Sequence, residues 1–89
     1  MELLITELSK DKFEITVKAD QLTKHTVSVT DQMLLNLTNN KTSKEELLNF
    51  SFKFLLERES NTSILSSFDL TVISKYFPEY ILKVENYCS

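Results

Sequence analysis

The stretch SKEELLNFSFKFLLERE, residues 43–59, decides how the rest of the chain must fold. Read as a helix, it spreads its leucines and phenylalanines over roughly 240° of its circumference, far beyond the ~100° stripe of a surface helix. We therefore expect a helix over Ser43–Glu59 that other elements cover on most sides. Ser43 and Glu46 have the spacing of a capping box. Glu45 and Glu46 in the first turn and Arg58 in the last suit the helix dipole.

Composition and charge limit the class of protein. The 89 residues are 42% hydrophobic and 26% charged, which predicts one folded domain over residues 1–89. The chain has no glycine, which excludes a glycine-rich phosphate loop and leaves left-handed backbone positions to Asn39, Asn40 and Asn61. A net charge of −3 does not favour nonspecific attraction to nucleic acid or to anionic lipid.

The cysteine content and the N-terminal stretch bear on cofactors and location. Cys88 is the one cysteine and His25 the one histidine, so neither an internal disulfide nor a zinc set is expected, and no cofactor is predicted. The opening residues MELLITELSKDK lack the basic segment and the long apolar run of a signal peptide. No apolar run approaches the length of a membrane span. We expect a cytoplasmic protein without a membrane partner.

Residues 1–30 carry the pattern of β-strands. Apolar and polar residues alternate along Phe13–Ala19 and again along Lys24–Thr30, which is typical of half-buried strands. Leu3–Leu8 is a third, less regular candidate. Because short turns join these segments, we expect an antiparallel meander of two or three strands with one face exposed to water.

From Asp31 onward the period becomes helical. Thr30 or Asp31 can cap a short helix that ends before the Asn39–Asn40 loop. The segments after the long helix are, in order, a turn at Ser60–Ser63, a short helical turn over Ile64–Phe68, a helix over Leu70–Phe77 capped by Asp69, and a last helix over Glu79–Asn86 that begins next to Pro78. The predicted class is α+β, with strands in 1–30 packed on a bundle of three to four helices in 31–86.

Several short motifs resemble a family of small bacterial proteins that is uncharacterised. They are HTV at 25–27, LLERE at 55–59, SIL at 63–65, FDLTVI at 68–73 and YFPEY at 76–80. The resemblance implies a bacterial origin and brings no activity with it.

Lys24–Glu59, predicted as a strand, a short helix, a loop and a capped helix, resembles the ribbon-helix-helix group of DNA-binding proteins. The resemblance implies a dimer that pairs this strand across a two-fold axis and a phosphate bound at the first amides of the long helix, at Ser43 and Lys44. The side chains that would read bases are Lys24, Thr26, Ser28 and Thr30. Against this stand the single cation on the strand, the upstream strands that can pair with it, and a loop without glycine.

Residues that suggest catalysis also have structural interpretations. His25 lies on the valine side of its strand, and no serine or cysteine is spaced to be its nucleophile, so a hydrogen-bonded structural histidine is expected. Glu57 and Glu59 are two apart in a helix and do not face each other, which predicts a solvated helix end instead of an acid–base pair. We expect no enzyme.

The sequence favours a noncatalytic protein that acts by protein–protein interaction or by self-association, because the wide apolar arc of the long helix needs cover. The partner would be another protein or a second copy, as in a homodimer. A ribbon-helix-helix-like regulator that binds nucleic acid is the alternative. The candidate interaction surface is aromatic and consists of Tyr76, Tyr80 and Tyr87.

Overall fold

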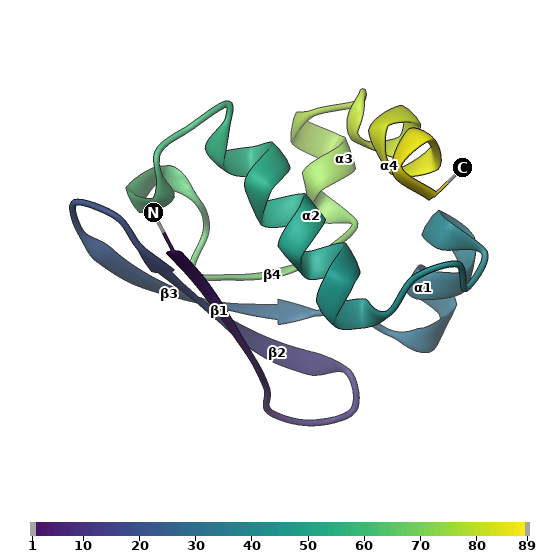
Figure 1. Ribbon diagram of the computed structural model, residues 1–89, viewed down its shortest axis with the longest axis horizontal. Coiled ribbons are helices and arrows are strands. Elements are labelled where there is room, and N and C mark those ends of the chain that lie inside the picture. The colour runs from purple at the N-terminus through teal and green to yellow at the C-terminus, as the bar shows by residue number, and fades with distance from the viewer. Residues whose placement is uncertain (1, 89) are drawn as a thin grey trace.

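The computed structural model describes residues 2–88 and has a four-stranded sheet with helices on one face (Figure 1). The strands β1 (Glu2–Glu7), β2 (Lys12–Lys18) and β3 (Leu22–Ser28) form an antiparallel meander, as predicted. Polar turns join them, and the register is continuous, with Ile5 opposite Ile15 and Ile15 opposite His25. The α+β class is therefore confirmed.

A fourth strand, β4 (Ser67–Asp69), was missed by the sequence analysis. It runs parallel to β3, with Phe68 opposite Val27. The prediction of a helical turn over Ile64–Phe68 is wrong, because Thr26 donates to the Ser66 carbonyl at 2.8 Å and draws this segment into the sheet. The 31–86 portion is consequently not all helical. A parallel neighbour needs a long crossover, and the two helices between β3 and β4 supply it.

Two helices connect β3 to the rest of the chain. The first, α1 (Asp31–Thr38), is capped by the Thr30 hydroxyl, which accepts from the Met33 amide at 3.1 Å. It ends at Asn39, whose φ of 54° is left-handed, and Asn40 follows with φ 60°. Asparagine tolerates this region better than most residues, so the loop turns without glycine.

The second helix, α2 (Lys44–Leu56), is the enclosed element that the sequence predicts. On one side Phe52 lies against the sheet, its ring 5.5 Å from that of His25. On another side Phe54 meets Tyr80 of the last helix, with ring centroids 5.3 Å apart. The helix ends before the predicted Glu59, and Arg58 donates to the Phe54 carbonyl at 2.9 Å, which satisfies an orphan acceptor at the helix end.

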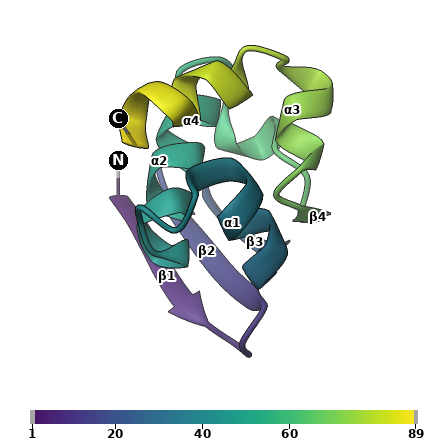
Figure 2. The same cartoon turned by 90° about the vertical axis from the view of Figure 1, so that its right-hand side faces the viewer.

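The C-terminal elements complete the cover of α2, and α4 lies on its side away from the sheet (Figure 2). They are the 3₁₀ turn η1 (Asn61–Ser63), α3 (Val72–Tyr76) and α4 (Tyr80–Cys88). The helix α3 is shorter than predicted because Leu70 donates to the Ser28 carbonyl at 3.0 Å and belongs to the end of the sheet. Asp69, predicted to cap this helix, lies in β4 instead and does not cap α3. Pro78 stands in the turn just before α4.

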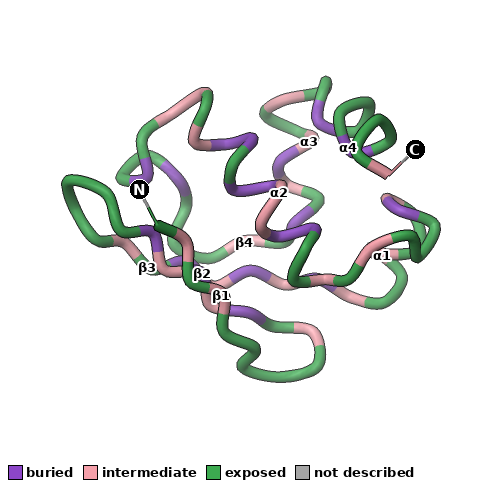
Figure 3. Tube along the Cα trace, in the orientation of Figure 1, coloured by how far each residue is buried: buried purple, intermediate pink, exposed green. Residues whose placement is uncertain are grey.

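One hydrophobic core lies between the sheet, α2 and the C-terminal helices, and burial is concentrated along α2 and the central strands (Figure 3). Its fully buried side chains include Ile15, Val17, Val27, Leu47, Leu48, Phe52, Leu70, Tyr80 and Val84. The opposite face of the sheet is polar, as expected for a half-buried meander. Within residues 2–88, no helix is long and apolar enough to cross a membrane.

Candidate functional site

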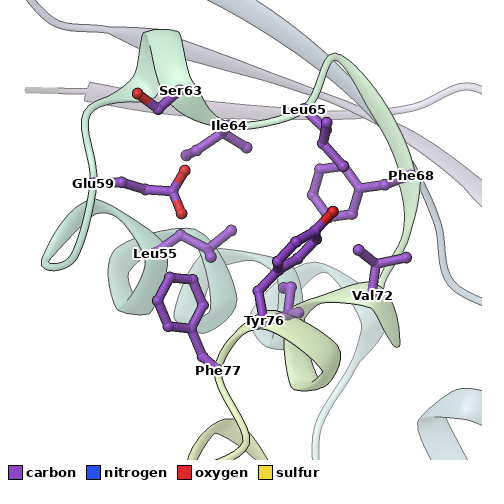
Figure 4. A pocket seen from close by; sticks show the side chains of 10 residues that line it. Leu55, Glu59, Ser63, Ile64, Leu65, Phe68, Val72, Tyr76 and Phe77 are labelled. Carbon is purple, nitrogen blue, oxygen red and sulfur yellow. The ribbon is translucent and has the colours of Figure 1, made fainter.

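An apolar pocket of about 350 Å³ opens between the end of α2, the segment that leads into β4, and α3 (Figure 4). Its lining is mostly aliphatic and aromatic, with a carboxylate and two hydroxyls: Leu55, Glu59, Ser63, Ile64, Leu65, Phe68, Val72, Ile73, Tyr76 and Phe77. A concave, mostly apolar surface with a few polar groups is typical of binding sites.

Long-range hydrogen bonds fix the wall that contains Ile64 and Leu65. Asn61 is buried, and its Nδ2 donates to the Gln21 carbonyl at 2.8 Å and to the Thr23 hydroxyl at 2.9 Å. His25 Nδ1 lies 2.7 Å from the Leu65 carbonyl. A carbonyl only accepts, so Nδ1 carries a proton. These bonds attach the pocket wall to β3 and the turn before it, which gives the pocket a preformed shape.

The rim of the pocket holds two large apolar side chains in water. Tyr76 is 68% exposed and Leu65 is 48% exposed. Figure 4 shows the Tyr76 ring standing between Phe77 and Phe68, with its hydroxyl directed toward Leu65. Exposed aromatic and aliphatic side chains beside a concavity are characteristic of contact sites.

Glu59 supplies the charge of the pocket. Its carboxylate points into the space between Leu55 and Ile64 (Figure 4). Glu59 makes no ion pair with any residue in 2–88. A half-buried carboxylate without a counter-charge favours a cation in the pocket, because opposite charges attract. The sequence analysis assigned Glu59 to a solvated helix end and did not predict this placement.

The tyrosines predicted as one surface are found in three different settings. Tyr76 lies at the pocket rim. Tyr87 is 45% exposed and stacks on Phe50, with ring centroids 4.5 Å apart. Tyr80 is 0% exposed, so its inclusion in a contact surface is wrong. Its hydroxyl is bound to Ser51 inside the core, and that burial raises the pKa of Tyr80 to about 12.

The residues predicted to read bases lie on a strand with neighbours on both sides. β3 pairs with β2 along its whole length and with β4 from Thr26 to Ser28. The pairing across a two-fold axis that a ribbon-helix-helix dimer requires is therefore not available to β3. On the open face Lys24 is exposed, Thr26 and Ser28 are half-buried, and the Thr30 hydroxyl is used in capping α1.

The predicted phosphate site at the start of α2 is engaged within the chain. The Ser43 hydroxyl accepts from the Glu46 amide at 3.1 Å and donates to the Glu46 carboxylate at 3.2 Å. Lys44 Nζ lies 2.8 Å from Asp31 and 3.1 Å from Asp11. The ion pair with Asp31 raises the pKa of Lys44 and, reciprocally, lowers that of Asp31. The cation is neutralised and carboxylates surround it, so this end of α2 does not favour an anion.

The structural interpretation of His25 is supported. The ring is buried, and both nitrogens are engaged, Nδ1 with the Leu65 carbonyl and Nε2 with the Thr23 hydroxyl at 2.9 Å. Residues 2–88 contain no group of three His, Cys, Asp or Glu that could hold a metal ion. Cys88 is half-buried and free.

No family model, curated protein or solved structure matches this chain. The two resemblances noted in the sequence stay predictions.

Proposed function

We propose that this protein is a noncatalytic interaction module that binds a protein partner through the pocket between α2 and α3. The observation that carries the proposal is the preformed apolar pocket with Tyr76 and Leu65 exposed at its rim. A volume of about 350 Å³ suits one or two large apolar side chains of a partner. Such anchors supply most of the binding energy at protein interfaces.

The charge of the pocket defines the partner further. Glu59 is the charged residue of the lining, and the whole chain carries a net charge of −3. A partner segment with a leucine or an aromatic residue beside lysine or arginine is complementary to both features, because opposite charges favour encounter and orientation. The polar groups of the lining are one carboxylate and two hydroxyls, with no histidine, lysine or cysteine among them, which supports binding over acid–base catalysis.

Nucleic-acid binding is the alternative that the sequence suggests. No observation at the residues predicted for it, on β3 and at the start of α2, supports it. Lys44 is held by two carboxylates, and β3 is paired on both sides. The pocket carries a carboxylate, which would repel a phosphate.

A peptide-display selection tests the proposal. The immobilised protein is presented with a random peptide library, in parallel with Glu59→Lys and with Glu85→Lys, which changes an exposed glutamate on α4. We expect the unaltered protein and Glu85→Lys to enrich peptides with an apolar residue beside lysine or arginine. Glu59→Lys should enrich peptides with an acidic neighbour instead. Failure to enrich any motif, or the same motif from all three proteins, would contradict the proposal.

A further inference from the structure

The strand β1 forms an open edge of the sheet. It pairs with β2 alone, and Figure 2 shows no element of residues 2–88 on its outer side. Native edge strands are usually short, bulged, or protected by lysine or proline. The sequence ELLITE has no lysine, proline or bulge, and its charges are confined to the end residues Glu2 and Glu7. Leu4, on the sheet face away from the helices, is 43% exposed. The other edge strand, β4, is only 3 residues long.

The hydrogen-bond pattern shows which groups of β1 are free. Leu8 donates to the Lys12 carbonyl at 2.9 Å, so these opposite residues form a hydrogen-bonded pair. Such pairs alternate along an antiparallel ladder, and the even-numbered residues of β1 therefore bond to β2. The backbone groups of Leu3, Ile5 and Glu7 point to the open edge.

We propose that two copies of this chain pair through β1, antiparallel about a two-fold axis, with Leu4 facing Leu4 and Leu3 opposite Ile5. A two-fold axis perpendicular to the sheet keeps the helix-covered faces of both copies on the same side. Because side chains alternate between the two faces of a strand, an odd-numbered residue can then oppose only an odd-numbered one, and an even-numbered residue only an even-numbered one. The proposed register brings the exposed Leu4 side chains together and matches the two half-buried residues Leu3 and Ile5. The next allowed register slides one strand by two residues and places Ile5 opposite Ile5. It would set the apolar Leu3 side chain opposite the Glu7 carboxylate.

Charge complementarity on the helix-covered face supports a second copy as the occupant. A groove of about 1030 Å³ runs beside β1 and is lined in part by Leu3. Its charged lining residues are three cations, Lys53, Arg58 and Lys83, and two carboxylates, Glu2 and Glu57, so a positive charge remains. Within residues 2–88 neither lysine makes a direct ion pair, although the charge of Lys83 acts on the nearby Glu79 carboxylate. In the proposed register, Glu7 of the second copy comes two residues after the Ile5 that faces Leu3, on the same side of the sheet. It therefore lies beyond Leu3 on the face of the sheet that the groove occupies, and Glu7 has no ion pair of its own in the described chain.

The dimer is independent of the proposed partner pocket. The pocket is lined by Phe68 of β4, at the opposite edge of the sheet from β1. A second copy on β1 would extend the sheet to eight strands and leave the pocket of each copy open. Failure of one proposal therefore leaves the other unaffected.

Disulfide trapping tests the pairing and its register. Leu4→Cys and Thr6→Cys are made in a Cys88→Ser background, which removes the native thiol. In the proposed register the two Leu4 residues are directly opposite, and their Cβ atoms are roughly 4.5–5.5 Å apart. A small adjustment brings two cysteines at this position within disulfide reach. The two Thr6 positions are separated by four residue steps, roughly 13 Å. We expect Leu4→Cys to form a covalent dimer at least tenfold faster than Thr6→Cys.

Sedimentation of the unaltered chain provides the second measurement. We expect the mass to rise from 10.4 kDa toward twice that value with increasing concentration. Leu4→Lys, with its circular dichroism spectrum unchanged, should remain monomeric, because lysine on an open edge opposes pairing. A monomer at millimolar concentration, equal trapping of both cysteine variants, or a folded Leu4→Lys dimer would overturn the proposal.

Discussion

The hydroxyl of Tyr80 lies 2.6 Å from the hydroxyl of Ser51 in the interior of the protein. The Ser51 hydroxyl donates its one hydrogen to the Leu47 carbonyl at 2.7 Å. The Tyr80 hydroxyl is therefore the donor in the hydrogen bond between Tyr80 and Ser51. This contact joins α4 to the middle of α2 across 29 positions of sequence. It shows that the last helix is part of the core, and that α2 is covered on the side away from the sheet.

Tyr80→Phe should change how stability depends on alkaline pH. Burial raises the pKa of Tyr80 from 10.0 to about 12. Between pH 10 and 12 the folded state therefore keeps the Tyr80 proton while the unfolded chain loses it. The free energy of unfolding is at its full value below pH 10 and falls as the pH rises through the folded pKa of about 12. The loss is on the order of 3 kcal/mol. Tyr80→Phe should cost about 1 kcal/mol at pH 8 and remove this loss.

Urea denaturation from pH 8 to 11 measures the first half of this loss, about 1.4 kcal/mol. Lys44, whose pKa is also raised, contributes a loss at high pH in both proteins, so the difference between them isolates Tyr80. Tyr76→Phe, at an exposed tyrosine, is the matched control and should follow the unaltered protein. An alkaline loss of equal size in Tyr80→Phe would contradict the assignment.

Asp31 should stabilise the fold above pH 4 and cease to do so in acid. Hydrogen bonds and charge from Lys44 and Lys10 lower its pKa below 3.8. A depressed carboxyl contributes stability that is present above its unfolded pKa and is lost as the pH falls through the folded value. Asp31→Asn should therefore lower the Tm at neutral pH and flatten the fall of Tm between pH 4 and 2.

The matched control for Asp31 is Asp20→Asn, an exposed aspartate in the turn between β2 and β3. It should leave the acid limb of the Tm curve unchanged. The effect of Asp31→Asn should also shrink in 1 M salt, because the carboxylate is exposed and screened. An acid limb identical in Asp31→Asn and the unaltered protein would disprove the role.

Asn61→Asp should destabilise the protein and the pocket wall together. The carboxylate cannot donate to the Gln21 carbonyl or the Thr23 hydroxyl, and it places a charge in a buried position. We expect a loss of about 1–3 kcal/mol by denaturant titration. Asn36→Asp is the control, because exposed Asn36 accepts from Gln32 and its aspartate can still accept. Equal stability of the two variants would refute the anchoring role of Asn61.

Local patterns in the sequence predicted much of this fold. The alternation along β2 and β3, the cap at Ser43 and the left-handed Asn39 and Asn40 are each determined by residues a few positions apart. Asn61 was also predicted to be left-handed, and this is wrong. The residue lies in the 3₁₀ turn because its side chain bonds to the turn between β2 and β3.

Features that depend on distant contacts were not predictable from these patterns. Phe68 joins the sheet because Val27, far upstream, offers an open strand edge. Nothing in the helical spacing of Ile64, Leu65 and Phe68 signals that pairing. The pocket was missed for the same reason, since its walls come from α2, the β4 segment and α3, and only Tyr76 had been singled out.

The most direct test of partner binding is an NMR titration of the ¹⁵N-labelled protein with a peptide from the display selection. Amide shifts should change at Leu65, Phe68, Val72 and Tyr76 around the pocket, and not at Lys24 on the open sheet face. Tyr76→Ala should weaken the affinity at least tenfold while the remaining spectrum stays folded. Shifts confined to the sheet face or to the start of α2, with the pocket amides unchanged, would contradict the account.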